Sequence, residues 1–221
     1  MKRSAAILSA ALLLIGNLHG FAQGFLNLNF EKITIITNQY PGGDTYNAII
    51  SSWTSYINKQ EIPADQVIFN DQTLDEPWVT IQGTNSTIYS PIPLPVQGKY
   101  TAYLLGPSMH AFGTNSAIGQ VGQIPTMAAS LVFWGQIANT TLVTFAGNPL
   151  TVNTIGSTAN YTIYGAAISP YAGQTGELLF TTTGRAILDN IQFSTTPVPE
   201  PSTLALAALG ILLFGYRRAK T

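Results

Sequence analysis

The sequence of 221 residues contains no cysteine and few charged residues, and each shortage excludes a class of protein. Without cysteine there is no disulfide framework, no thiolate zinc site and no thiol nucleophile. Charged residues make up 9% of the chain, whereas ordinary globular domains carry about 25%. A hydrophobic fraction of 46% argues against disorder driven by charge. The surface must therefore rely on threonine, asparagine, serine and glutamine for its solubility.

Residues 1–22 have the order of a secretory signal peptide. Lys2 and Arg3 supply a positive start, and Ala5–Ile15 is a run of small and apolar residues. Gly20 and Ala22 place small side chains before a cut, so we expect cleavage after Ala22. The alternative is an uncleaved anchor, but the run is shorter than the ~20 residues that span a bilayer.

Residues 197–221 form a second apolar segment. The linker over residues 195–201 is extended, because prolines exclude a helix and push the residues before them out of the α region. Ser202 can cap a short apolar helix over residues 204–216. That helix is about 20 Å long, which is short for a hydrocarbon core of about 30 Å. Three basic residues follow and stop transfer: Arg217, Arg218 and Lys220.

The motif Pro199-Glu200-Pro201, the apolar helix behind it and the basic end together resemble the PEP-CTERM sorting signal of Gram-negative bacteria. The resemblance implies that a membrane-embedded exosortase processes the tail and that the released protein goes to the cell surface or the extracellular matrix. The helix is then a temporary membrane anchor. The alternative is a permanent single-pass anchor with a proline-rich stalk.

Residues 23–196 indicate one all-β domain, a jelly-roll-type antiparallel β-sandwich. Short apolar stretches are separated by Gly, Pro, Asn and Thr, without a helical period of useful length. Leu131 and Phe133 alternate with Trp134, as in a strand with one buried face. The expected strands are Phe25–Thr37, Trp78–Gln82, Lys99–Leu105, Ala117–Gly122, Ser130–Gln136, Leu142–Phe145, Asn160–Ala167, Glu177–Thr182 and Ile187–Phe193.

Residues 40–78 are less regular than the rest of this domain. We expect long loops there over one end of the sandwich, with a short helix over Thr45–Ile57 as one option.

The segments Asn27–Glu31 and Leu188–Phe193 resemble the first and last strands of galactose-binding-like jelly rolls of carbohydrate-binding modules. In that group the two strands are neighbours, and the resemblance implies a structural Ca²⁺ held by carboxylates and backbone carbonyls, here with Glu31 and Asp189 as ligands. Oxygen ligands suit this hard cation. Each carboxylate has the parity of nearby apolar residues, so it points inward unless a bulge intervenes. The alternative is a turn hydrogen bond for Asp189 and an ion pair for Glu31.

Exposed aromatic rings are the expected contacts for a carbohydrate, because their faces stack on the C–H groups of a sugar. The tryptophan candidates are Trp53, Trp78 and Trp134, with Tyr56 and Tyr89 as further rings. The alternative is that most of them belong to the core.

Catalysis has weak support in the sequence. His110 is the one histidine left after removal of the signal peptide, and neither a G-x-S-x-G elbow nor a glycine-rich phosphate motif is present. We therefore predict a non-enzymatic exported protein without a cofactor other than Ca²⁺. The alternatives are a purely structural surface protein and a secreted polysaccharide hydrolase, which would use two of the acids Asp65, Asp71, Asp75, Glu76 and Glu177.

The near-neutral total charge conceals an acidic domain. Between the two terminal signals lie four basic residues, Lys32, Lys59, Lys99 and Arg185, against nine acidic ones, which gives a net charge of −5. Such a domain is a poor partner for nucleic acid or anionic lipid. An extracellular polysaccharide is the expected partner besides the exosortase.

Overall fold

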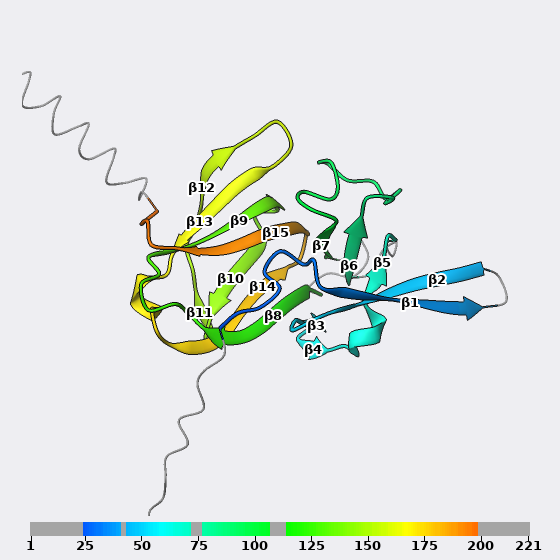
Figure 1. Ribbon diagram of the computed structural model, residues 1–221, viewed down its shortest axis with the longest axis horizontal. Coiled ribbons are helices and arrows are strands. Elements are labelled where there is room, and N and C mark those ends of the chain that lie inside the picture. Colours follow the sequence, from blue (N-terminus) through cyan, green and yellow to red (C-terminus); the bar gives the residue numbers. More distant parts are fainter. Residues whose placement is uncertain (1–23, 41–42, 72–76, 107–113, 199–221) are drawn as a thin grey trace, which may run out of the picture.

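The computed structural model describes residues 24–40, 43–71, 77–106 and 114–198, and these residues form two packed β-sheets (Figure 1). The nine-stranded sheet contains, in spatial order, β1 (Ile33–Tyr40), β2 (Gly43–Ile50), β5 (Ile68–Phe69), β6 (Trp78–Gly83), β7 (Tyr100–Leu105), β15 (Arg185–Ser194), β9 (Ser130–Ile137), β13 (Thr162–Ala167) and β12 (Val152–Ser157). The six-stranded sheet contains β11 (Asn148–Pro149), β10 (Thr141–Phe145), β14 (Thr175–Thr182), β8 (Ser116–Gln123), β3 (Thr54–Ile57) and β4 (Gln60–Glu61). Two 3-10 turns, η1 (Ala64–Gln66) and η2 (Ser169–Tyr171), complete the described elements.

The chain alternates between the two sheets, as in a jelly roll. From β7 it crosses to β8 in the six-stranded sheet, returns to β9, crosses again to β10 and β11, and ends in β15 at the centre of the larger sheet. The strand pairs are antiparallel except for β5 with β6. The predicted all-β sandwich is confirmed.

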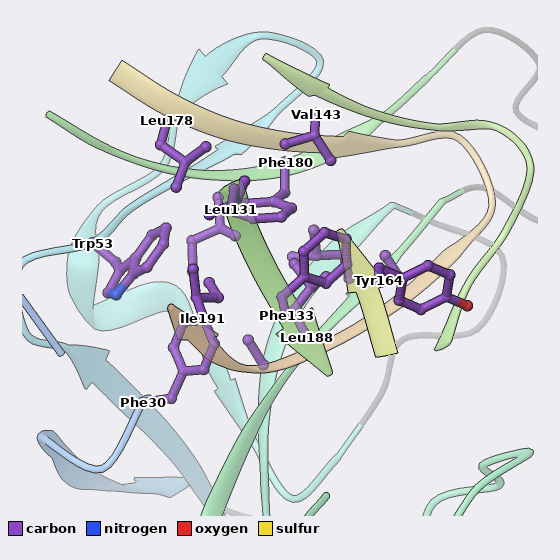
Figure 2. Close-up of a cluster of buried hydrophobic side chains, with 14 of the residues drawn as sticks. Phe30, Trp53, Leu131, Phe133, Val143, Tyr164, Leu178, Phe180, Leu188 and Ile191 are labelled. Carbon is purple, nitrogen blue, oxygen red and sulfur yellow. The ribbon is translucent and has the colours of Figure 1, made fainter. Parts of the chain in front are cut away.

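The core lies between the sheets and is rich in aromatic rings. Leu131 and Phe133 on β9 are fully buried. Trp134, which follows Phe133 and points to the opposite face, is only partly buried, as the alternation predicts. The ring of Phe133 stacks on Tyr164 from β13 and meets Phe180 from β14 edge to face, with centroids 5.2 and 5.3 Å apart (Figure 2). These rings join the two sheets into one hydrophobic unit.

The predicted first strand is wrong in its first half. Residues 25–32 lie outside the strands, and two of them, Asn27 (φ 50°) and Phe30 (φ 56°), have a left-handed backbone that interrupts regular strand geometry. The Asn27 amide bonds the backbone of Lys32 and stabilises this turn. The alternation of apolar and polar residues in this segment predicted a strand, because it contains no information on such a local side-chain hydrogen bond. Beside the turn, the Ile191 N–H donates to the carbonyl of Leu28, so this segment lies next to the last strand.

The expected loops and optional helix in residues 40–78 are also wrong in part. Residues 45–57 contribute to β2 and β3 instead of a helix. β2 pairs with β1 over its full length, from Ile33 opposite Ile50 to Tyr40 opposite Gly43. Pairing with a partner strand outweighs a weak local helical preference.

Candidate functional site

Two carboxylates, Glu31 and Asp189, line one small cavity of about 100 Å³ together with Asn29, Gln97 and Gly98. Asp189 is 1% exposed, but it does not lie between the two sheets. Its side chain projects from β15 on the outer face of the nine-stranded sheet. There the loop between β6 and β7 covers the carboxylate, and Gln97 of that loop donates a hydrogen bond to it. A register shift follows directly in β15, which changes the inward parity expected from the sequence.

Both oxygens of Asp189 accept hydrogen bonds. Oδ2 accepts from the Gln97 N–H at 2.9 Å and from the Thr101 hydroxyl at 2.8 Å. Oδ1 accepts from the Asn190 N–H at 2.7 Å. Burial nevertheless raises the pKa of Asp189 from 3.8 to about 6; the hydrogen bonds oppose this change, and the charge of Glu31 adds to it. The site therefore favours either a proton or a nearby positive charge.

The residues of this cavity fit a hard cation by the chemistry of their donors. Glu31 Oε1 accepts from the Lys99 N–H at 2.7 Å, and an ionised carboxylate offers about four lone-pair sites, so acceptor capacity remains. Gly98 has φ +64°, and a Cβ there would collide with the Glu31 carboxylate. Within the part of the chain that the structure describes, no group of three or more His, Cys, Asp or Glu could hold a metal. A cation would thus depend on two carboxylates, the Asn29 amide and backbone carbonyls.

A stacked aromatic pair lies on the outer face of the nine-stranded sheet. The rings of Trp134 and Tyr161 are 4.8 Å apart between centroids and tilted by only 11°. Trp134 faces outward because Leu131 and Phe133 on the same strand face the core. Tyr161 directly precedes β13, whose Ile163 is the cross-strand partner of Trp134. Sequence reasoning selected Trp134 but missed Tyr161, because only the strand register brings them together.

The other predicted aromatic contacts are used by the fold. Trp53 is 6% exposed, donates from Nε1 to the Asn27 carbonyl at 2.9 Å, and packs on Phe30, which argues against a ligand role. The Nε1 of Trp78 is shielded from solvent and has no hydrogen-bond partner among the described residues. Tyr56 donates to the Glu177 carboxylate at 2.8 Å.

Tyr89 is 74% exposed, and its ring lies under the Arg185 guanidinium at 5.8 Å. The same guanidinium lies 5.7 Å from the ring of buried Tyr103, so one of the few basic residues is held between two tyrosines.

A larger hollow of about 370 Å³ opens between the edges of the two sheets, and no local sequence pattern predicts it. It is lined without a charged side chain, which suits a neutral polar ligand. The lining residues come from separate strands and turns: Ile137, Ala138, Asn139, Thr141, Leu150, Val152, Thr154 and Tyr164.

The last described residues lie on the same outer face as the aromatic pair. The Ser130 hydroxyl donates to the Thr196 carbonyl at 2.8 Å. Val198 lies over Gly165 of β13, where an added Cβ would be 2.7 Å from a Val198 methyl group and 3.1 Å from Ile155. The chain can follow this path because Gly165 has no side chain.

Several predicted features lie outside the described residues. These are the signal peptide over residues 1–22, His110, the sorting motif Pro199-Glu200-Pro201, the apolar helix over residues 204–216, and the basic stop Arg217, Arg218 and Lys220. Among the residues that are described, no helix has the length and apolar character needed to cross a membrane.

The C-terminal segment that begins at the described end of the domain matches a family model over residues 197–219, the PEP-CTERM protein-sorting motif. The chain carries a PEP-CTERM sorting signal. The resemblance seen in the sequence is confirmed, and it identifies an exported protein that is sorted to the surface of a Gram-negative bacterium and processed by an exosortase in the membrane.

Solved structures resemble the domain only distantly. The enzymatically active domain of bacteriophage CBA120 tailspike protein 4 is 15% identical with a TM-score of 0.37; the match covers 65% of this chain and 19% of that chain. A Stig cyclase, Fisc, from Fischerella sp. TAU is 14% identical with a TM-score of 0.40, over 77% of this chain and 94% of that chain. Nothing about function follows from likeness at this level. Among curated proteins, no sequence matches this chain.

Proposed function

We propose that the PEP-CTERM chain is a non-enzymatic protein of the cell surface or extracellular matrix that binds carbohydrate on the outer face of its nine-stranded sheet. The observation that carries the proposal is the stacked pair of Trp134 and Tyr161. The two rings are stacked on each other, so each has one face against its partner, and the outer side of the pair is left for the C–H groups of a sugar; both side chains are partly exposed.

Amide groups flank this aromatic platform, which we define as Trp134 and Tyr161. Strand β15 pairs with β9 beside Trp134 and contributes Asn190 and Gln192, whose amides are hydrogen-bonded to each other at 2.7 Å. Gln192 is exposed and Asn190 is partly exposed, so both have capacity left for hydroxyl groups. Rings for C–H faces and amides for hydroxyls are the two contacts that a polysaccharide needs.

The net charge of the exported domain favours a neutral glycan. With four basic residues against nine acidic ones, the domain repels anionic polymers at a distance. Arg185 is the one arginine between the two terminal signals, and its guanidinium already lies over the rings of Tyr89 and Tyr103.

The proposal is tested by titrating the exported, processed protein with a panel of polysaccharides and following tryptophan fluorescence. We expect Trp134→Ala to weaken binding by at least about tenfold, or about 1.4 kcal/mol. Val121→Ala is the control, because it shortens an exposed apolar side chain on β8 of the other sheet. An equal loss of polysaccharide affinity in both variants would contradict the role of the platform. If the wild type binds none of the polysaccharides, the alternative of a purely structural surface protein is favoured.

We also propose that the cavity of Glu31 and Asp189 holds a structural Ca²⁺. The supporting observation is that two carboxylates, one of them 1% exposed, line one cavity without a basic side chain. A bound cation would tie the N-terminal segment to the last strand and to the loop between β6 and β7. A melting temperature that EDTA leaves unchanged would contradict this proposal.

A further inference from the structure

The strand β1 is a free edge of the nine-stranded sheet. It pairs with β2 on one side through eight consecutive residue pairs without a bulge. On its other side no described strand is paired with it. The β1–β2 hairpin, which we call the arm, projects away from the rest of the sandwich (Figure 1).

The register shows which backbone groups on β1 are unpaired. The Ala48 N–H donates to the Val67 carbonyl at 2.8 Å, so Ala48 turns its backbone groups away from β1. Its partner across the pair is Ile35. Hydrogen-bonded and non-hydrogen-bonded pairs alternate in an antiparallel ladder, so Ile35 and Thr37 direct both N–H and C=O groups outward. By the same alternation, Ile33 and Gln39 also direct their backbone groups outward, and we call these four residues the outward row.

The other edges formed by the described strands are protected, and β1 is not. β4 and β11 are two residues long, and β11 contains Pro149. β12 is interrupted by a bulge between Thr154 and Gly156. Residues 33–40, by contrast, contain no charge, no proline and no glycine, and five of the eight are Ile or Thr residues with high β propensity. Natural proteins rarely leave such an edge without a partner.

We propose that β1 pairs with β1 of a second copy of this chain, in an antiparallel and two-fold symmetric manner that joins the two large sheets into one. An uncharged strand opposes no like charges when it meets its own copy. The antiparallel arrangement brings the base of each arm, with Lys32, to the far end of the other arm, where β2 begins at Gly43 and contains Asp44. Ile35 and Tyr46, which are 42% and 45% exposed, add apolar contact area along the arm.

The pairing predicts a specific register. Full overlap of the outward row places Ile33 opposite the partner's Gln39 and Ile35 opposite the partner's Thr37, so the two-fold axis passes through Ile36. Ile36 then faces its own copy in a non-hydrogen-bonded pair, with Cα atoms about 4.5 Å apart. That spacing permits a disulfide, and the absence of cysteine from the chain makes an introduced one unique.

The first test is sedimentation velocity of the exported, processed protein over a range of concentrations. We expect a monomer–dimer equilibrium that Ile35→Lys and Ile35→Pro each weaken by at least about tenfold. The proline removes an outward N–H and leaves the β1–β2 hydrogen bonds in place. Val121→Lys is the matched control, since Val121 is 67% exposed on β8 of the other sheet. Unchanged circular dichroism of all three variants shows that the fold is retained.

The second test is mild oxidation of Ile36→Cys, with Val121→Cys as the control. We expect fast formation of a disulfide-linked dimer with Ile36→Cys alone. A wild-type protein that is monomeric at every concentration, a dimer that the Ile35 substitutions do not weaken, or equal cross-linking of the two cysteine variants would each overturn the proposal. None of these results depends on glycan binding, so the dimer proposal and the carbohydrate-binding proposal can fail independently.

Discussion

Replacing Asp189 by asparagine tests how the buried carboxylate affects the free energy of unfolding. Burial raises the pKa of Asp189 from 3.8 to about 6, so the folded state binds the proton more tightly than the unfolded state does. The stabilisation that comes from protonating Asp189 is complete below the pKa that this group has in the unfolded chain. It is lost as the pH rises through the pKa that the group has in the folded protein. A shift of this size corresponds to about 3 kcal/mol in the free energy of unfolding.

The expected effect of Asp189→Asn follows from the same contacts. The amide keeps the shape of the carboxyl group and removes its charge, but its NH₂ group can no longer accept from one of the three donors, Gln97, Thr101 or Asn190. Losing that bond costs about 1 kcal/mol. In EDTA near neutral pH the variant should therefore be more stable than the wild type by about 1–2 kcal/mol. Near the unfolded pKa it should be slightly less stable.

The assay is urea denaturation of the exported protein across this pH range, in EDTA and in Ca²⁺. Asp65→Asn is the control, because it makes the same change in charge at an exposed position. If the difference in the free energy of unfolding between the wild type and Asp189→Asn does not vary with pH, burial does not raise the pKa of Asp189 as described. If Ca²⁺ stabilises the wild type and not Asp189→Asn near neutral pH, the cation proposal is supported; if it stabilises neither, that proposal fails and the pKa reasoning stands.

Three further predictions concern the core, the hydrogen bond between Tyr56 and Glu177, and the C-terminal segment. Phe133→Ala removes a fully buried ring and should lower the free energy of unfolding by about 3–5 kcal/mol in urea denaturation; a loss below about 1 kcal/mol would contradict the packing described. Tyr56→Phe removes the hydrogen bond to Glu177 and should cost about 1 kcal/mol in the same assay, whereas no change would show that water replaces it. Gly165→Ala should displace Val198 from the sheet and speed exosortase processing in cells, measured by intact mass; slower or unchanged processing would show that this contact does not limit access.

The strands and the sorting signal could be predicted from the sequence because both are local. Ser130–Ile137 is a short apolar run bounded by turn residues, and its side chains alternate between buried and partly buried positions as neighbouring residues of one strand do. The sorting signal is likewise a linear motif over residues 197–219, recognisable without a fold. The all-β class followed from the same short patterns.

The candidate sites depend on strand order and register, which no local pattern contains. Glu31 and Asp189 share a cavity because the N-terminal turn lies beside β15, and their proximity was suggested by a family resemblance and not by their spacing. Trp134 meets Tyr161 because β9 pairs with β13 in one register. A shift of one residue would turn Trp134 toward the core. The composition and local pattern thus determine an exported, acidic β-sandwich, while long-range pairing decides which of its few carboxylates and aromatic rings are buried and which are available to a ligand.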